Sequence, residues 1–415
     1  DYISDEQLKW ADMGDVYDKV VIGDKEYDFV KGVQNFKDKM LSYFPDEEQA
    51  IKEYVDLVFA AVKTSKGFYM DKALSPLLSM LIGGKMRKSF YKFSDKTTYE
   101  VLRSITNNED LIKVLCGQYG DYGLPPKQSS FVMHASVARH YFSGGSFPIG
   151  GSSKIVETVN KVIESAGGNI LISAEAEEVV IKNNKAIGVK MTDGKVFSAK
   201  NVISGAGVMT TYNKLISKEI VEKHKLKSQL KTVKRSVSHA CLYIGLKGSP
   251  EELNLPKTNY WIYPEKIDHD TAINNYLKDL NQDFPVVYIS FPSAKDSDWS
   301  NRYPGKSTID IITLLPYEPF NKWNGSRWMK REKEYNDLKE KIAQRLLKEL
   351  FKHIPQVEGN IEHYELSTPL TTQHFINYEE GEIYGLDHTP KRFRQRFLKP
   401  RTPIKNFYLT GQDIV

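Results

Sequence analysis

The sequence predicts an α/β fold assembled from separate segments, and three observations favour it. A helix expected over about residues 152–166 leads directly into a series of short strands with tight turns. Two glycine turns, at 205–207 and 411–413, each follow an apolar strand. The remaining chain mixes long amphipathic helices with strand candidates and contains no internal repeat. We therefore expect a mixed fold with more than one structural unit.

The composition indicates a folded protein rather than one that binds nucleic acid. The chain has 415 residues, of which 40% are hydrophobic and 12% aromatic, enough to bury a large core. Charged residues make up 27%, and the net charge is only +5. Dedicated nucleic-acid binders carry a larger and clustered excess of basic residues. We therefore expect no nucleic-acid partner.

Cysteine usage and hydropathy indicate a reducing compartment and no membrane span. The two cysteines, Cys116 and Cys241, have neither the spacing of a metal site nor that of a redox pair. No segment contains the ~18 consecutive apolar residues that a membrane-spanning helix needs. We expect a cytoplasmic protein with no metal centre and no disulfide framework.

Residues 143–215 have the clearest predicted architecture. Ser152 or Ser153 is a candidate N-cap for an amphipathic helix, and Gly167 with Gly168 ends that helix through a left-handed turn. Alternating apolar residues then predict a β-meander, with a tight turn beginning at Asn183. Its strands are expected at 169–173, 178–182, 186–191 and 196–204.

The first 142 residues are expected to be mostly helical, beginning with a helix at 47–66. Within them, residues 73–96 form an apolar run that leads into basic residues interleaved with aromatic ones. This order is typical of a segment that lies on a membrane surface. The alternative, a buried helix followed by a solvated charged helix, stays open.

Residues 216–365 are expected to form a second, mixed unit. Strand candidates at 238–246, 286–291 and 309–315 are expected to share one sheet. A lysine-rich surface helix is expected at 331–351, because apolar residues recur there at helical spacing.

A glycine pair at the start of the 152–166 helix is the first candidate ligand site. Gly150 and Gly151 would let the backbone approach a ligand closely, and a helix N-terminus offers free N–H groups with a favourable dipole. Such a turn suits a phosphate or the edge of a flavin. A glycine pair before a helix is also common as a simple tight turn.

Several motifs occur together in the order known from one family. They lie at 122–126, at 134 and 140–153, at 202–207 with 211–212, at 367–371, at 384–388 and at 402–413. Together they cover most of the chain. This ordered set resembles the carotenoid desaturase, carotenoid isomerase and retinol saturase group of FAD oxidoreductases, within the amine oxidase and phytoene desaturase superfamily.

The resemblance implies a split, Rossmann-like FAD-binding domain with an inserted α+β substrate domain. Residues 143–215 and 366–415 would supply the cofactor side, and residues 1–142 and 216–365 the substrate side. The strand and Gly-x-Gly-x-x-Gly turn that normally cradle the pyrophosphate are absent from the sequence. We therefore expect the chain to be a fragment that begins after this motif and ends within the last cofactor segment.

The resemblance also assigns cofactor contacts residue by residue. The pair at 150–151 with Ser152 would lie against FAD, Ala176 would contact the adenine through its backbone, and the turn at 411–413 would contact the ribityl-pyrophosphate portion. Tyr384 and Gly385 match the stretch that approaches the isoalloxazine. The full expected set is Gly150, Gly151, Ser152, Ala176, Gly205, Gly207, Tyr384, Gly385, Gly411, Gln412 and Asp413.

The activity implied is an FAD-dependent oxidoreductase that saturates or desaturates a carbon–carbon bond of an apolar isoprenoid, a retinoid or a carotenoid. NAD(P)H is a candidate electron donor, and the polyene substrate suggests peripheral attachment to a membrane. The alternatives are a flavin oxidase of an amine or porphyrin-like substrate, a carotenoid isomerase, and a non-catalytic isoprenoid-binding protein.

No catalytic side chain is predicted. His134, His140, His374 and His388 invite assembly into a base or a metal site, but none has ligand spacing on a clear helix face. A lone histidine is more often a structural group. In flavin chemistry the cofactor carries the electrons, so an acid or base is optional.

Overall fold

A seven-stranded mixed sheet forms the largest layer of the protein. The computed structural model describes residues 2–414, so Asp1 and Val415, the ends of the expected fragment, lie outside the described residues. The strand order is β13-β9-β12-β11-β10-β2-β3, with β10 and β2 parallel and the other neighbours antiparallel. The strands are β2 (Val16–Ile22), β3 (Lys25–Val30), β9 (His239–Lys247), β10 (Asn259–Tyr263), β11 (Val287–Ser290), β12 (Lys306–Leu314) and β13 (Ile361–Ser367).

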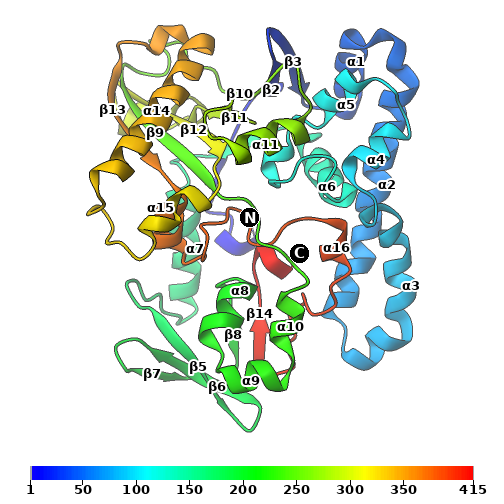
Figure 1. Ribbon diagram of the computed structural model, residues 1–415, viewed down its shortest axis with the longest axis vertical. Helices are drawn as coiled ribbons and strands as arrows, with labels where there is room; N and C mark the ends of the chain where they lie inside the picture. The colour runs from blue at the N-terminus through cyan, green and yellow to red at the C-terminus, as the bar shows by residue number, and fades with distance from the viewer. Residues whose placement is uncertain (1, 415) are drawn as a thin grey trace.

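This sheet joins the two segments that were expected on the substrate side. The β2–β3 hairpin comes from the first 142 residues, and the other five strands come from residues 239–367. α14 (Lys333–His353) packs on one face, where Ile309 and Ile311 of β12 meet Leu346 and Leu350. On the other side, α1 (Val33–Tyr43), α2 (Glu48–Ala73) and α6 (Phe131–Tyr141) share a second core with β2 and β10 (Figure 1).

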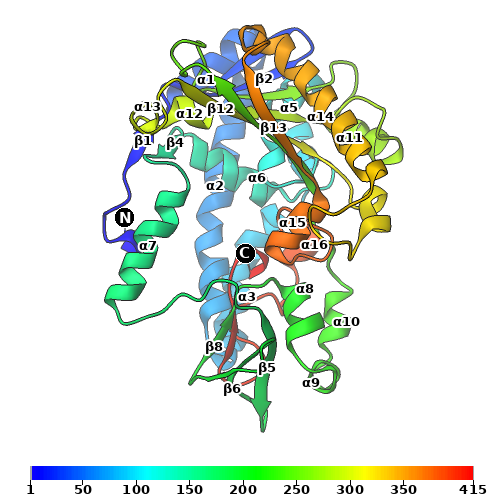
Figure 2. The same cartoon turned by 90° about the vertical axis from the view of Figure 1, so that its left-hand side faces the viewer.

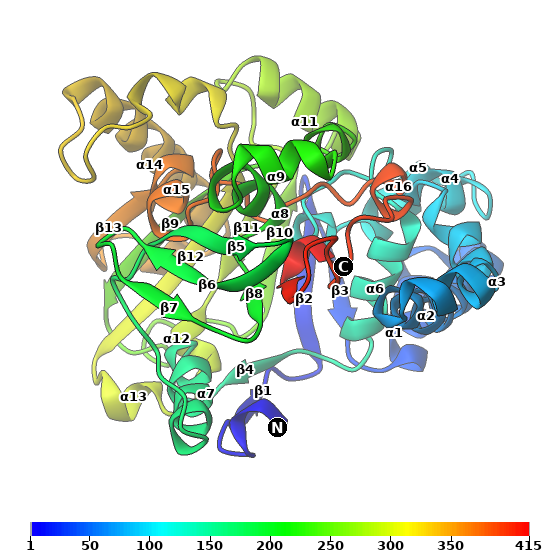
Figure 3. The same ribbon diagram turned by 90° about the horizontal axis from the view of Figure 1, so that it is seen from below.

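A smaller α/β unit lies below the large sheet. β8 (Val202–Ser204) and β14 (Phe407–Leu409) pair in parallel, beside a meander of β5 (Ala176–Lys182), β6 (Lys185–Met191) and β7 (Val196–Ser198). The short helices α8 (Val208–Thr210), α9 (Lys218–Lys223) and α10 (Leu226–Leu230) complete its core. Seen from below, the C-terminal turn lies between the meander and the long helices (Figure 3).

The glycine pair and its helix form a separate arm. β4 (Ser146–Pro148) pairs with β1 (Trp10–Asp12), and α7 (Ser153–Ser165) follows the glycines. Residues 166–175 then connect α7 to the meander, and α7 lies apart from β8 in the side view (Figure 2). Ser152 occupies the N-cap position, but its side chain makes no capping hydrogen bond.

Several predicted elements are confirmed. The helix expected at 47–66 is α2, the helix expected at 331–351 is α14, and the three strand candidates of 216–365 do share one sheet. The tight turn of the meander is also present, because Asn183 and Asn184 both have positive φ, at 49° and 59°. Gly167 has φ of 78° at the end of α7, as the left-handed helix end requires.

The first 142 residues are mostly helical, as expected, but the strands β1, β2 and β3 that precede α1 were not predicted. Two strand predictions are wrong. Residues 169–173 form no strand, and 196–204 is not one strand but two that belong to different sheets, β7 with the meander and β8 with β14. For β2 and β8 the pairing partner decides the outcome, because β2 pairs with β10 far along the chain and β8 pairs with β14.

α3 (Pro76–Ser94) exposes the apolar residues of its first half. Leu77, Met80 and Leu81 are 63%, 74% and 68% exposed. The interpretation of this run as a buried helix is therefore wrong. Within residues 2–414, none of the helices combines the length and the apolar character needed to cross a membrane.

The contact between α2 and α3 depends on one buried carboxylate. Asp71 accepts hydrogen bonds from Ser79 Oγ and Arg87 Nη1, both at 2.6 Å. Burial opposes ionisation of Asp71, but these bonds and the charge of Arg396 outweigh it and lower the pKa.

We expect Asp71→Ala to lower the free energy of unfolding by about 2–3 kcal/mol, because it leaves Arg87 half-buried without its partner. The matched control is Asp95→Ala, which removes an exposed ion pair with Arg394 and should cost less than about 1 kcal/mol. Urea unfolding measures both. Equal losses in the two variants would contradict the assigned role of Asp71.

Candidate functional site

Two glycine turns lie side by side at the carboxyl ends of parallel strands. Leu409 of β14 is in register with Ser204 of β8, and Thr410 N donates to Ser204 O at 2.9 Å beyond the paired residues. Gly205 and Gly411 follow these two strands immediately. In open α/β sheets, nucleotides bind in the crevice at the carboxyl ends of parallel strands. The two turns therefore form a candidate cofactor site.

The backbone at these two turns is accessible to a ligand. A Cβ added at Gly411, where φ is 94°, would have Gly205 O as its nearest neighbour, at 3.8 Å. A Cβ at Gly205 would meet only Thr410 Cγ2, at 3.6 Å. Neither glycine is crowded by protein, so both leave space for the close approach of a ligand. The residues present thus fit the group that the resemblance implies, a dinucleotide.

The carboxylate of Asp413 joins the C-terminal turn to two other segments. It accepts hydrogen bonds from Val208 N at 2.7 Å and from Leu386 N at 3.0 Å. Burial raises the pKa of Asp413, while these bonds and the charge of Arg392 oppose that rise. Both carboxylate oxygens are used by the backbone of the protein. Asp413 therefore positions the turn.

Arg392 reinforces the same junction from the other side. Its side chain is buried and donates from Nη1 to Leu386 O at 2.6 Å and from Nη2 to Gln412 O at 2.7 Å. The side chain of Gln412 donates to the Tyr378 hydroxyl at 3.0 Å. Charge-assisted bonds of this kind hold buried loops in one geometry. Residues 385–386, 207–208 and 411–413 therefore act as one rigid unit.

The structure brings most of the predicted cofactor residues together. Gly207 and Gly385 both crowd Asp413, and a Cβ at either position would contact its carboxylate. Tyr384 lies next to this unit in the chain. The residues that meet at this junction are Gly205, Gly207, Tyr384, Gly385, Gly411, Gln412 and Asp413.

The other predicted residues lie in different surroundings. Gly150 N donates to Asp296 Oδ1 at 2.9 Å. A Cβ added at Gly151 would lie 4.0 Å from Arg302 Nη2. These contacts tie the glycine pair and Ser152 to the segment between β11 and β12. Ala176 opens β5 and pairs with Met191. Their cofactor contacts stay a prediction.

A second group of functional interest crosses the large sheet on the face opposite α14. The register aligns Tyr243 with Asp310, Asp310 with Ser290, and Asn259 with Asp18. The ammonium group of Lys295 donates to Ser290 Oγ at 2.6 Å and to Asn259 Oδ1. We call these residues the polar stripe.

Burial shifts the ionisation of the polar stripe. It lowers the pKa of Lys295 to about 8 and raises that of Asp310 to about 6, although each group's charge partly offsets the shift of the other. Burial also raises the pKa of Asp18, against bonds from Asn259 and Gln118. Perturbed groups of this kind concentrate at functional sites. Sequence reasoning missed the stripe, because its members come from strands far apart in the chain.

Asp121 lies between the polar stripe and the cofactor junction. The Tyr384 hydroxyl donates to Gly120 O at 2.8 Å, which attaches this segment to residues 384–386. Burial and the charge of Asp18 raise the pKa of Asp121 to about 8, partly offset by hydrogen bonding with Tyr141. Asp121 was not predicted as a site residue from the sequence, although it directly precedes the motif at 122–126.

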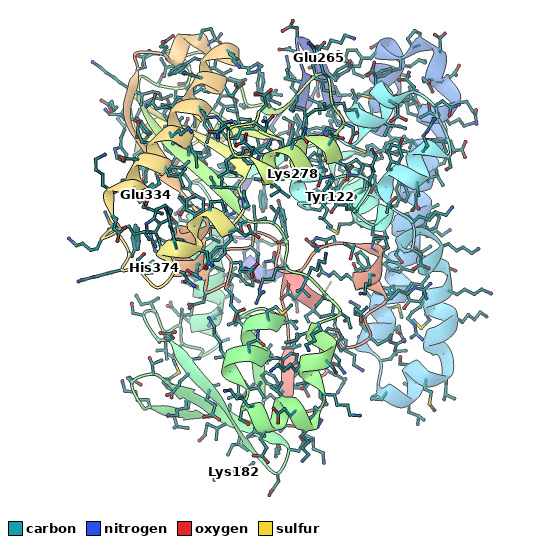
Figure 4. The ribbon with its side chains drawn as sticks, viewed as in Figure 1. Tyr122, Lys182, Glu265, Lys278, Glu334 and His374 are labelled. Carbon is teal, nitrogen blue, oxygen red and sulfur yellow. The ribbon has the colours of Figure 1, made fainter. Side chains whose placement is uncertain are left out.

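Of the four histidines considered above, His134 and His388 are buried, whereas His140 and His374 are exposed. His134 lies between two tyrosine hydroxyls, with Nε2 at 2.9 Å from Tyr54 and Nδ1 at 3.1 Å from Tyr122, which lies beside α6 in the interior (Figure 4). Burial lowers its pKa to about 4, so it is neutral at physiological pH. Across residues 2–414, His, Cys, Asp and Glu side chains form no group that could hold a metal ion.

Known proteins are similar to this chain over its whole length. The chain is 34% identical over 437 residues to the all-trans-retinol 13,14-reductase of Danio rerio, covering 100% of this chain and 71% of that protein. The chain belongs to the all-trans-retinol 13,14-reductase family. An inactive all-trans-retinol 13,14-reductase of Danio rerio is 29% identical with the same coverage. The chloroplastic prolycopene isomerase of Arabidopsis thaliana is 28% identical over 247 residues, 60% of this chain and 38% of that protein.

Solved structures confirm the fold class. An oxidoreductase from Methanosarcina mazei superposes with a TM-score of 0.56 at 16% identity, over 98% of this chain and 77% of that one. Putrescine oxidase bound to putrescine gives 0.59 at 11% identity, over 100% and 79%. The fold is therefore of the amine oxidase type, as predicted. No protein-family model matches the chain, and the comparisons give no support to the expectation that it is a fragment.

The junction at Asp413 gives a prediction for Gly385→Ala. At φ of 62° an added Cβ is strained, and it would also collide with Asp413 Oδ1. The matched control is Gly359→Ala, which has φ of 86° but nothing within 4 Å. We expect the control to cost about 1 kcal/mol of unfolding free energy and Gly385→Ala about 3 kcal/mol or more. Denaturant unfolding measures both losses of unfolding free energy. Equal losses in the two variants would show that residue 385 does not constrain the junction.

Proposed function

We propose that this protein is an FAD-dependent oxidoreductase that saturates or desaturates a carbon–carbon bond of an apolar isoprenoid, a retinoid or a carotenoid. Its similarity over the whole chain to all-trans-retinol 13,14-reductases carries the proposal. The glycine turns after β8 and β14 support it, because they have the arrangement that dinucleotide sites use. NAD(P)H is the proposed source of electrons.

The junction residues would hold the cofactor. The backbone of Gly205 and Gly411 would lie against its ribityl-pyrophosphate portion, and Tyr384 with Gly385 would face the isoalloxazine. Bound FAD supplies hydride chemistry, which no amino-acid side chain provides. Asp413 and Arg392 keep the turns in place, so their role is to position the backbone that contacts the cofactor.

The names of two relatives suggest alternatives to this activity. Prolycopene isomerase points to polyene isomerisation, and the inactive reductase points to binding without catalysis. An amine oxidase is the third alternative, since solved amine oxidases have the same fold. Product masses distinguish these outcomes, because saturation adds two hydrogens, isomerisation leaves the mass unchanged and binding yields no product.

The test is to purify the protein, record its flavin absorption, and incubate it with all-trans-retinol or a linear carotene and a reductant. We expect a bound flavin and a product that differs by two hydrogens, heavier if the polyene is saturated and lighter if it is desaturated. As a matched pair, Asp413→Ala should lose flavin, whereas Asp193→Ala in the exposed meander turn should retain it. A protein that binds no flavin, or one that oxidises an amine instead, would refute the proposed function.

We also propose that the protein is cytoplasmic and attaches peripherally to a membrane through α3. The exposed leucines and methionine of its first half could enter the interface of a bilayer, and exposed lysines follow on the same helix. Arg87 does not belong to this set, because it is paired with buried Asp71. The lysines that remain are Lys85, Lys88 and Lys92.

Changing these three lysines to glutamine should weaken binding to anionic vesicles at least about tenfold, since each basic residue contributes about 1 kcal/mol near such a surface. Replacing Leu77, Met80 and Leu81 by serine should weaken binding to neutral vesicles as well. The control changes three exposed lysines of α14, namely Lys333, Lys348 and Lys352. Vesicle cosedimentation measures all variants, and equal effects of the α3 and α14 lysines would exclude α3 as the attachment site.

A further inference from the structure

Asp121 has a fixed backbone and a carboxyl group that is only partly satisfied. It ends a short 3-10 helix, Tyr119–Asp121, in which Asp121 N donates to Gln118 O at 3.1 Å. Its Oδ2 atom is shielded from solvent and has no hydrogen-bond partner among the described residues. A buried carboxyl oxygen without a partner is costly, so it is uncommon in a part of a protein that only serves folding.

The neighbouring carboxylate shows the contrast. Asp18 is also buried, but it accepts a bond from Gln118 Nε2 at 2.6 Å and one from Asn259 Nδ2 at 2.8 Å. Asp18 is thus a satisfied structural group, and its negative charge acts on Asp121. The charge of Asp18 adds to burial in raising the pKa of Asp121 to about 8, which favours the protonated form of Asp121 at neutral pH.

Asp121 is connected to the cofactor junction by a short series of contacts. Asp413 accepts from Leu386 N, two residues after Tyr384. The Tyr384 hydroxyl reaches Gly120 O, and its ring packs against Gly123, where an added Cβ would lie 2.8 Å from the ring. Asp121 lies between these two glycines. The junction and Asp121 therefore keep a constant spacing.

Aromatic groups surround Asp121 on its other sides. A Cβ at Gly120 would collide with the Trp261 ring, and that ring lies 4.4 Å from the ring of Tyr288. Tyr141 stacks on Tyr17 at 5.2 Å. The titratable groups whose charges act on Asp121 or respond to it are Asp18, Tyr17, Tyr122, Tyr141, Tyr263, Tyr288 and Tyr384. A carboxyl among aromatic walls suits an apolar polyene.

We propose that Asp121 is the proton donor for polyene saturation, an inference that rests on the proposed function. The π bond of one C=C unit breaks, and its electrons form a C–H bond with the carboxyl proton of Asp121. The other carbon would receive a hydride, with its two electrons, from a reduced flavin, which would thereby be oxidised. Two C–H bonds form, and Asp121 becomes a carboxylate. Water then returns a proton to Asp121 with the Tyr141 hydroxyl as its hydrogen-bonding neighbour.

Other acidic or basic groups nearby are less suited to this step. Both ring nitrogens of His134 are taken by tyrosine hydroxyls. Burial and the charge of Arg392 lower the pKa of His388 to about 3, so its ring is neutral at physiological pH and is a poor proton donor. Asp310 faces the ammonium group of Lys295, which favours its charged form. Asp121 alone among these groups combines a retained proton with a free carboxyl oxygen.

The decisive variant is Asp121→Asn, which keeps the shape but cannot donate a carboxyl proton. We expect kcat for polyene saturation to fall about 100-fold or more while flavin content stays unchanged. Asp121→Glu should recover part of this loss. The control is Asp110→Asn, an exposed residue of α5 (Glu109–Leu115), which should retain wild-type kcat.

Two further readouts separate catalysis from structure. In heavy water, the wild type should place one deuterium on a single face of the product, and Asp121→Asn should give a mixture of faces. Infrared spectra should contain the C=O band of a protonated carboxyl at neutral pH, which fades as pH rises through about 8 and is missing from Asp121→Asn. This band needs no substrate and no turnover.

The outcomes are distinguishable. An active wild type with an equally active Asp121→Asn variant, or a wild type that lacks the carboxyl band, would overturn the role of Asp121 and leave the proposed function standing. A wild type that contains the carboxyl band but neither saturates nor desaturates the polyene would overturn the proposed function, and with it the catalytic role of Asp121.

Discussion

The carboxylate of Asp413 is the interaction on which the candidate site depends. It takes two backbone N–H groups, from Val208 and Leu386, that come from segments far apart in the sequence. These bonds bring the turn after β8, the turn after β14 and the loop before α16 (Pro390–Phe393) to one point. Without a carboxylate there, two buried N–H groups would lose their acceptors. Gly207 and Gly385 leave the space that this carboxylate occupies. The same junction fixes Tyr384, through which the small α/β unit reaches the helical half of the molecule.

The two faces of the seven-stranded sheet differ in composition. On the α14 side, alternate residues of β9 and β12 are aliphatic and buried, so this face supplies stability. On the other face, the same strands present Tyr243 and Asp310, and β11 adds Tyr288. A strand pattern with one mainly aliphatic face and one polar, aromatic face leaves the second face available for binding. Because the β2–β3 hairpin extends this sheet, the first segment of the chain contributes Asp18 to the polar stripe.

The sequence predicted those elements whose signals are local. α14 repeats apolar residues at helical spacing, and the Asn183–Asn184 turn carries the residues that tolerate positive φ, so both were found. The C-terminal turn was found because its glycine and carboxylate are adjacent in the motif. β2 was missed because its pairing with β10 involves residues more than 200 positions away, and short-range patterns do not report such pairing. Asp121 was missed for a related reason: an aspartate beside a loop motif looks solvated in the sequence, and the groups that enclose it, such as Asp18, Tyr141 and Tyr384, lie in other segments.

The shifted pKa values of the buried ionisable groups indicate that these groups are retained for function. Asp121 has a pKa raised from 3.8 to about 8 and Asp310 one raised to about 6, so each destabilises the folded state increasingly as pH rises through those intervals. Lys295 has a pKa lowered from 10.5 to about 8, so its cost is full below about 8 and is relieved only at higher pH. Near neutral pH the carboxyl groups of Asp121 and Asp310 and the ammonium group of Lys295 all destabilise the folded state, so none of these three groups contributes to stability there. Hydrophobic or amide side chains of similar size would fold with less penalty. Three costly groups within one sheet face and its adjoining loop, next to a rigid junction of glycine turns, are therefore better explained by chemistry at this site than by folding.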